Sequence, residues 1–128
     1  MTPTQTDLLR RVREAVGPDR ELDADIARWQ GWTSRDTEND WHDLVWCRPD
    51  GQPCPLRSYT ASLDDALELV ERVRPGTWWS VSVDRTGGYE GRISAEGHLF
   101  IEEGLATPAL ALVAALLLAS PANPDEGE

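Results

Sequence analysis

The chain has 128 residues, of which 23 are acidic and 12 are basic, and its formal net charge is −11. This length allows one domain with a real core but is too short for two. Hydrophobic residues make up 40% of the chain and include six tryptophans, which argues against an intrinsically disordered protein. The negative charge repels the phosphate backbone of nucleic acids, so the composition also argues against general DNA or RNA binding.

The N-terminal segment lacks the uninterrupted apolar core of a secretion signal. We therefore expect a cytoplasmic protein in which Cys47 and Cys54 are reduced. The apolar run near the C-terminus is shorter than the roughly 20 residues that a membrane-spanning helix needs. The sequence thus predicts no membrane partner.

Two helices are expected in the first third of the chain, at Asp7–Val16 and Arg20–Gln30, because apolar residues recur there at helical spacing. Residues 33–43 are polar and acidic, and we expect a loop. The apolar run Leu44–Arg48 precedes the turn signal Pro49-Asp50-Gly51, which predicts a short strand.

The clearest helix signal lies in the middle of the chain, where Ser62 and Asp65 have the spacing of a capping box and predict a helix at Ser62–Arg74. A strand is expected next, because polar and apolar residues alternate strictly along Trp78–Asp84. Glycine-containing turns then predict a meander with two further strands, Tyr89–Ser94 and His98–Glu102.

The segment Leu105–Ser120 predicts a helix at Thr107–Ala119 that carries no charge. Such a helix must pack against other parts of the protein on nearly every side. We expect one apolar side to face the sheet. The other side, which we expect to meet a symmetry-related copy or the N-terminal helices, contains Leu112, Leu116 and Ala119.

Together these elements predict an α+β fold in which an antiparallel sheet of three to five strands is sandwiched between helices. We expect residues 1–120 to form a single domain and residues 121–128 to form a disordered acidic tail, because the tail has no apolar anchor. The uncharged C-terminal helix further predicts a homo-oligomer.

Several segments resemble the phage ABA-sandwich domain family, a family of small phage and prophage proteins. The resemblance covers roughly residues 20–119 and implies an antiparallel sheet held between helices, an origin in a phage or prophage, and hence the cytoplasm of a host cell. The family supplies no catalytic residues that can be transferred to this chain. The segments that carry the resemblance are Arg20–Asp23 with Ile26-Ala27 and Gly31-Trp32, Tyr59–Leu67, Trp78-Trp79 and Ala106–Leu112.

The tryptophans are the main candidates for ligand binding, since Trp41, Trp46 and Trp78 are expected to lie partly outward. Aromatic rings beside arginines can stack on a nucleobase and bind its phosphates. Alternatively, these tryptophans line a protein interface or cover the edge of the core. The candidate ligand-binding residues are Trp41, Trp46, Arg48, Arg57, Tyr59, Trp78 and Arg85.

No set of residues points to a particular reaction. His42, Cys47 and Cys54 do not match the spacing of a paired metal-ligand motif, so we expect no metal site and no cofactor. A Cys47 nucleophile would need His42 or His98 as its base. The candidate carboxylates for acid–base catalysis or for binding a divalent ion are Asp40, Asp43, Glu102 and Glu103. We expect Glu102 and Glu103 to face solvent.

Two classes of function remain open. The first is a non-enzymatic phage or prophage accessory protein that acts by binding, either sequestering a small nucleotide-like ligand or masking a host protein, and so serves an anti-defence role. The second is a small hydrolase that acts on a nucleotide and depends on a metal or a cysteine. The acidity of the chain would suit a basic surface on a host protein.

Overall fold

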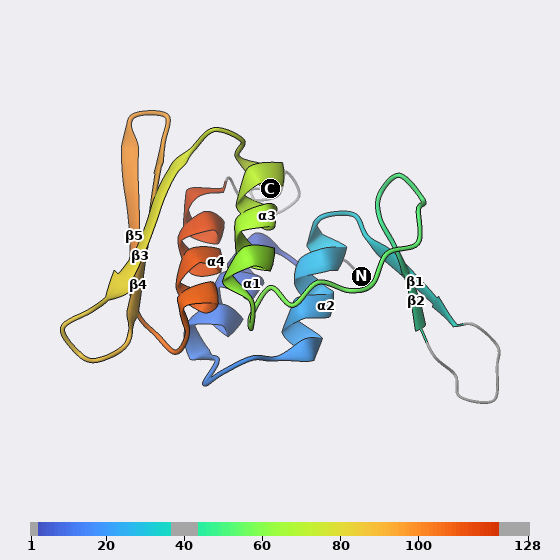
Figure 1. Ribbon diagram of the computed structural model, residues 1–128, viewed down its shortest axis with the longest axis horizontal. Helices are drawn as coiled ribbons and strands as arrows, with labels where there is room; N and C mark the ends of the chain where they lie inside the picture. The colour runs from blue at the N-terminus through green and yellow to red at the C-terminus, as the bar shows by residue number, and fades with distance from the viewer. Residues whose placement is uncertain (1–2, 37–43, 121–128) are drawn as a thin grey trace.

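The computed structural model describes residues 3–36 and 44–120. Figure 1 shows a three-stranded sheet at one end of the molecule, a two-stranded hairpin at the other end, and the helices between them. The expected α+β class is confirmed, and the described strands form two antiparallel sheets rather than one. In chain order the elements are α1 (Gln5–Glu14), α2 (Arg20–Trp29), β1 (Thr33–Asp36), β2 (Leu44–Cys47), α3 (Leu63–Val73), β3 (Trp78–Val83), β4 (Tyr89–Ala95), β5 (His98–Leu105) and α4 (Pro108–Ala119).

The first two helices lie close to their expected positions. The α1 helix begins earlier than expected because Thr4 caps it, its hydroxyl accepting a hydrogen bond from the Asp7 backbone N–H. It ends at Glu14, so Val16, which we expected inside the helix, is 97% exposed instead. The α2 helix begins after Asp19, whose carboxylate accepts hydrogen bonds from two backbone N–H groups of the first turn.

The strands β3, β4 and β5 form the expected antiparallel meander, in sequence order. Its second turn consists of Glu96 and Gly97, whose φ angles of 53° and 81° are those of a type I′ turn. This turn places Ala95 opposite His98 and so fixes the register of β4 and β5. The β5 strand runs past its expected end to Leu105, with a bulge in the pairing near the start of β4.

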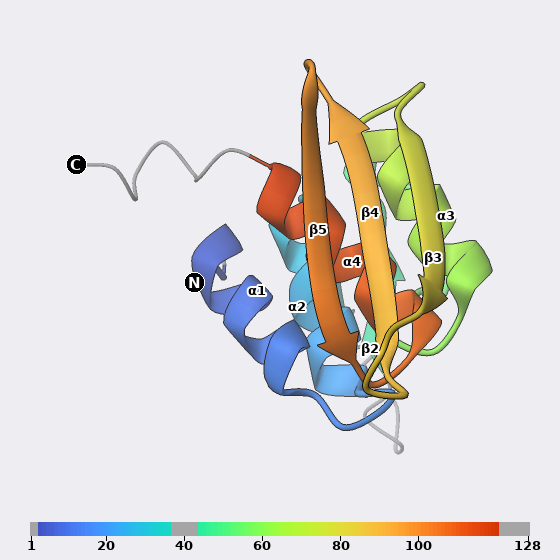
Figure 2. The same ribbon diagram turned by 90° about the vertical axis from the view of Figure 1, so that its left-hand side faces the viewer.

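The α4 helix is the centre of the core. It packs on β4 and β5, and α3 and α1 pack against its other sides (Figures 1 and 2). Thr107 caps its first turn by accepting a hydrogen bond from Leu110 N at 3.0 Å. It also lies very close to β4, because a Cβ atom on Gly91 would be only 2.1 Å from the carbonyl oxygen of Ala111. Only glycine permits this approach.

The side of α4 that we expected at an interface with a second copy is covered within the monomer. Leu112 and Leu116 have no exposed surface, and Ala119 is buried. Of the two expected partners, the N-terminal helix α1 is the one that packs on α4, so the prediction of a copy at this face is wrong. None of the helices in the described ranges combines the length and apolar character needed to cross a membrane.

A partly buried ion pair joins α1 to the sheet. Both oxygens of the Glu102 carboxylate accept hydrogen bonds from the Arg13 guanidinium at 2.7 Å. Glu102 is buried, so our expectation that it faces solvent is wrong, whereas Glu103 is exposed as expected. The difference follows from strand alternation, which turns Glu102 toward the helices and Glu103 away from them.

A second buried carboxylate joins α2 to the segment before α3. Asp23 is 1% exposed, and one of its oxygens accepts hydrogen bonds from both the backbone N–H and the hydroxyl of Thr60, each at 2.8 Å. Its other oxygen accepts a hydrogen bond from Arg20 at 3.0 Å. Arg20 also donates to the backbone carbonyls of Leu56 and Arg57, so it holds this segment against α2.

The first part of the expected loop at 33–43 is a strand. β1 pairs with β2 in antiparallel register, with Thr33 opposite Cys47. Alternation could not predict β1, because its four residues are polar and its pairing depends on β2, a distant segment. Residues 37–43 and the expected tail at 121–128 lie outside the described residues.

Candidate functional site

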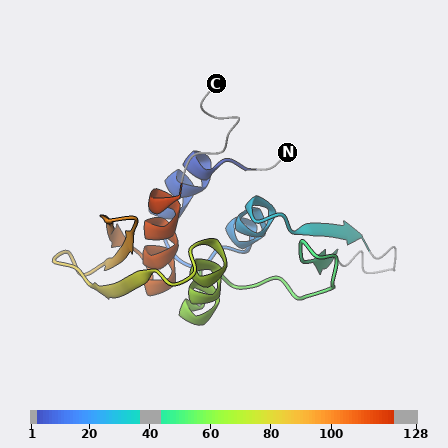
Figure 3. The same ribbon diagram turned by 90° about the horizontal axis from the view of Figure 1, so that it is seen from above.

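The outer face of the three-stranded sheet is not covered by any element in the described part of the chain. Figure 2 looks onto this face, and Figure 3 shows that the helices lie on the opposite side of the sheet. Because side chains alternate along paired strands, every second residue points outward. The rows across the outer face are Trp78, Ser94 and Leu99, then Ser80, Arg92 and Ile101, then Ser82, Glu90 and the bulge residue Glu103.

One end of the outer face is apolar. Trp78 is 56% exposed and Leu99 is 52% exposed, and they flank Ser94 in the same row. Ile101 in the next row is also exposed. Single exposed apolar side chains are common on protein surfaces, but neighbouring ones on an open sheet face are typical of an interaction surface.

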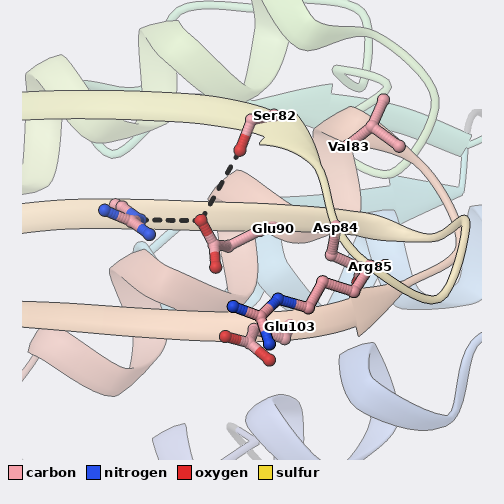
Figure 4. Close-up of a pocket in the computed structure, with 7 residues that line it drawn as sticks. Ser82, Val83, Asp84, Arg85, Glu90 and Glu103 are labelled. Atoms are coloured by element: carbon pink, nitrogen blue, oxygen red, sulfur yellow. Dashed lines mark hydrogen bonds and ion pairs between the residues drawn. The ribbon is translucent and has the colours of Figure 1, made fainter.

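The other end of the outer face is polar and contains a pocket of about 680 Å³. Figure 4 shows its side chains, which come from β3, β4, β5 and the turn after β3. The Arg92 guanidinium donates a hydrogen bond of 2.7 Å to Glu90, and this contact lowers the pKa of Glu90. The pocket contains three carboxylates and two guanidinium groups, in a lining formed by Ser82, Val83, Asp84, Arg85, Glu90, Arg92 and Glu103.

Asp84 organises the backbone around this pocket. One of its oxygens accepts hydrogen bonds from Thr86 and from Gly88 N, and the other accepts one from Gly104 N at 2.6 Å. The Thr86 hydroxyl is the main cause of the lowered pKa of Asp84. Gly104 has a φ of 77°, which favours glycine, and it follows Glu103 in the β5 bulge. Asp84 therefore ties the β3–β4 turn to the bulge that carries Glu103.

The structure does not bring the expected ligand-binding residues together. Trp78 lies on the outer face, and Arg85 lines the pocket at the far end of β3. The remaining described residues lie elsewhere: Trp46 in β2, Arg48 directly after β2, Arg57 beside Glu68 of α3 and Tyr59 shortly before α3. Trp41 lies outside the described residues.

Two of the expected aromatic rings are already covered. Trp46 is 9% exposed, and the Arg28 guanidinium lies 5.1 Å from its ring centroid, so the expectation that it lies outward is wrong. Tyr59 is buried, and this burial raises its pKa to about 12. Neither ring offers an open surface on which a base could stack.

Arg57 already has a partner within the protein. It lies 3.3 Å from Glu68, which also pairs with Arg72 at 3.4 Å. The Cys54 side chain is the main cause of the raised pKa of Arg48. The Nε atoms of Arg48 and Arg57 are buried, and neither has a hydrogen-bond partner among the described residues.

The cysteines form no catalytic or metal-binding cluster in the described ranges. Cys47 pairs with Pro53, and Cys54 N donates to Trp46 O, so alternation turns the two thiols to opposite faces, and both cysteines are free. Cys47 ends β2 and His98 begins β5, at opposite ends of the molecule (Figure 1). No group of three or more potential metal ligands occurs among the described residues, and His42 lies outside them.

Sequence reasoning missed most of the outer face. It identified the alternation along Trp78–Asp84 but did not extend it to β4 and β5. That signal was present, because the polar residues of β4 alternate with glycine, isoleucine and alanine. No family model, curated protein or solved structure matches the chain.

Proposed function

We propose that this protein is a non-enzymatic binding protein of phage or prophage origin, as its resemblance to the phage ABA-sandwich family implies. It acts in the cytoplasm of the host cell and masks a basic surface of a host protein, in an anti-defence role. The observation that carries this proposal is the open outer face of the sheet, on which exposed apolar residues adjoin a polar end with a net negative charge.

Electrostatics favours a protein partner over a nucleotide-like ligand. Phosphates that entered the pocket would meet the carboxylates of Asp84, Glu90 and Glu103. Trp78 and Arg85 are separated by seven positions, which corresponds to roughly 20 Å along an extended chain. The two residues lie at opposite ends of β3, so they do not form one compact site for a base and its phosphates.

The chemistry of the outer face matches that of protein interfaces. Such interfaces combine a central apolar group, often with tryptophan, and a polar rim that sets orientation. Trp78, Leu99 and Ile101 provide the apolar part, and Glu90 and Glu103 provide acceptors for lysine or arginine. The net charge of −11 would also accelerate encounter with a basic partner.

Site-specific photocrosslinking in infected host cells tests the proposal. A photoreactive residue at position 80, in the centre of the outer face, is expected to give a discrete crosslinked product, whereas one at the exposed Glu71 of α3 is not. With the captured partner purified, Ile101→Asp is expected to weaken binding at least about tenfold, because it places an unpaired charge in the interface. Glu71→Ala serves as the matched control.

Two outcomes would overturn this function. Equal crosslinking at positions 80 and 71 would show that the outer face is not selective. If nucleotides incubated with the protein were recovered as cleaved products after denaturation, the rival hydrolase would be supported instead.

A further inference from the structure

The outer face adjoins a sheet edge that pairs with no other strand in the described part of the chain. β3 is an edge strand, because the strand order is β3-β4-β5. Asp84 N donates to Gly88 O, and bonded pairs alternate along antiparallel strands. Ser82, Ser80 and Trp78 therefore bond to β4, so the N–H and C=O groups that point to the free edge belong to Trp79, Val81 and Val83.

The two edges of this sheet differ in how well they are protected against pairing with another strand. At the β5 edge, a bulge interrupts the pairing, Glu102 and Glu103 carry charge, and Arg13 of α1 binds Glu102. At the β3 edge, six residues, WWSVSV, contain no charge and no proline. Proteins usually protect such an edge with lysine, proline or a bulge, and β3 has none of these.

We propose that an extended, basic segment of the masked host protein pairs with the free edge of β3 and adds a fourth strand to the sheet. This inference rests on the proposed function, whose binding face it extends. Strand addition of this kind draws its affinity from main-chain hydrogen bonds and its specificity from alternate side chains. Val83 is 69% exposed at this edge and would be covered by the added strand.

Side chains on the outer face specify the added strand. Trp78 offers an apolar contact, whereas Ser80 and Ser82 are small and leave space above β3. The Ser82 hydroxyl lies 3.5 Å from the Glu90 carboxylate, so a long basic side chain opposite Ser82 can extend across it to Glu90. Positions opposite Trp78 and Ser82 are four residues apart on one face, so the segment carries an apolar residue and, four positions away, an arginine or lysine.

Charge argues against a second copy of this chain as the partner that pairs with the free edge of β3. Each copy carries a net charge of −11. Antiparallel pairing of two β3 strands would bring two chains of the same strong negative charge together, whereas a basic segment is attracted to this chain.

A synthetic peptide probe tests the inference. The probe is a fluorescein-labelled nonapeptide of alternating valine and threonine in which an isoleucine and an arginine stand four positions apart. Fluorescence anisotropy is expected to show binding to the wild-type protein. Val83→Pro is expected to weaken it at least about tenfold, because proline removes an N–H that faces the free edge and none that bonds to β4.

Matched controls separate edge pairing from damage to the fold. Val83→Thr keeps the N–H and the β-branched shape, so its affinity is expected to stay within about twofold of wild type. If Val83→Pro does not fold, Ser82→Lys, which is expected to repel the arginine of the probe on the outer face, is compared with Ser82→Glu, which is expected to attract it. Replacing the arginine of the probe by glutamate is expected to weaken binding about tenfold.

The outcomes distinguish this inference from the proposed function. If Ile101→Asp abolishes binding of the crosslinked host partner while Val83→Pro does not, the outer face binds the partner but strand addition is wrong. If neither variant changes binding of that partner, both proposals fail. A wild-type dimer in analytical ultracentrifugation that Val83→Pro converts to monomer would assign the edge to a second copy and overturn the choice of occupant.

Discussion

Two regions of the molecule bury apolar surface to different extents. The body, which consists of α1, α3, α4 and the β3–β4–β5 sheet, is built around the fully apolar α4 helix. The arm, which consists of α2, the β1–β2 hairpin and residues 48–58, buries Leu22 and Ile26 of α2 in the same core, and it also contacts the body through polar side chains such as Asp23. The body therefore supplies most of the buried apolar surface, and polar contacts add to the smaller apolar contribution of the arm.

Gly91→Ala is expected to have the largest effect, because the new Cβ would lie 2.1 Å from the carbonyl oxygen of Ala111 in α4. Both atoms belong to the packed backbone of the body, so α4 would have to move away from β4. We expect a loss of about 3 kcal/mol in the free energy of unfolding, measured by urea denaturation. Gly17→Ala is the control, since its Cβ would meet nothing within 4 Å. Equal losses in both variants would contradict the close contact.

Leu112→Ala tests whether the body carries the apolar stability. Leu112 has no exposed surface, and its truncation is expected to cost about 3 kcal/mol through lost burial and the remaining cavity. Leu44→Ala in the arm is expected to cost less than about 0.5 kcal/mol, because Leu44 is largely exposed. Urea denaturation of both variants gives the comparison, and a large loss for Leu44→Ala would show that the hairpin contributes to the core.

Asp23→Ala tests the buried polar junction between the arm and the body. It leaves the Thr60 N–H and hydroxyl without their shared acceptor in a buried site, for which we expect a loss of about 2 kcal/mol. Thermal unfolding measures this loss. Glu21→Ala in the same helix is exposed and is expected to stay within about 0.5 kcal/mol of wild type. A neutral Asp23→Ala variant would mean that the junction adds nothing.

Asp25→Asn is expected to have the smallest effect, and that effect depends on pH. Asp25 lies 2.5 Å from Arg11 of α1 and 2.8 Å from Arg28 of α2. Partial burial raises the pKa of Asp25, but hydrogen bonds from these arginines outweigh burial and hold the pKa below its usual value. The contribution is therefore present above the unfolded pKa of about 3.9 and is lost as pH falls through the lower folded pKa.

The measurement for Asp25 is the free energy of unfolding between pH 2 and pH 7. Wild type is expected to lose more stability than Asp25→Asn on acidification below about pH 4, because only the wild-type carboxylate can be protonated. Parallel curves for the two proteins would contradict the proposed role of this ion pair.

Most of the helices and the three-stranded meander were predictable because their signals are local. Ser62 accepts a hydrogen bond from Asp65 N as the capping-box spacing predicts, and strict alternation identified β3. The strand β1 was not predictable, because its four residues, TSRD, are all polar and show no alternation of polar and apolar side chains. Of the candidate site, Trp78 and Arg85 were anticipated, but their separation by the length of β3 was not.

The sequence alone determined the α+β class, the caps, the turns and the need to bury an uncharged helix, because each follows from residues close together in the chain. Only the tertiary structure decided which surface covers that helix, which carboxylates are buried and which face of the sheet stays open. These depend on contacts such as Arg13 with Glu102 and Gly91 with Ala111, whose partners are far apart in sequence and meet only when the domain packs.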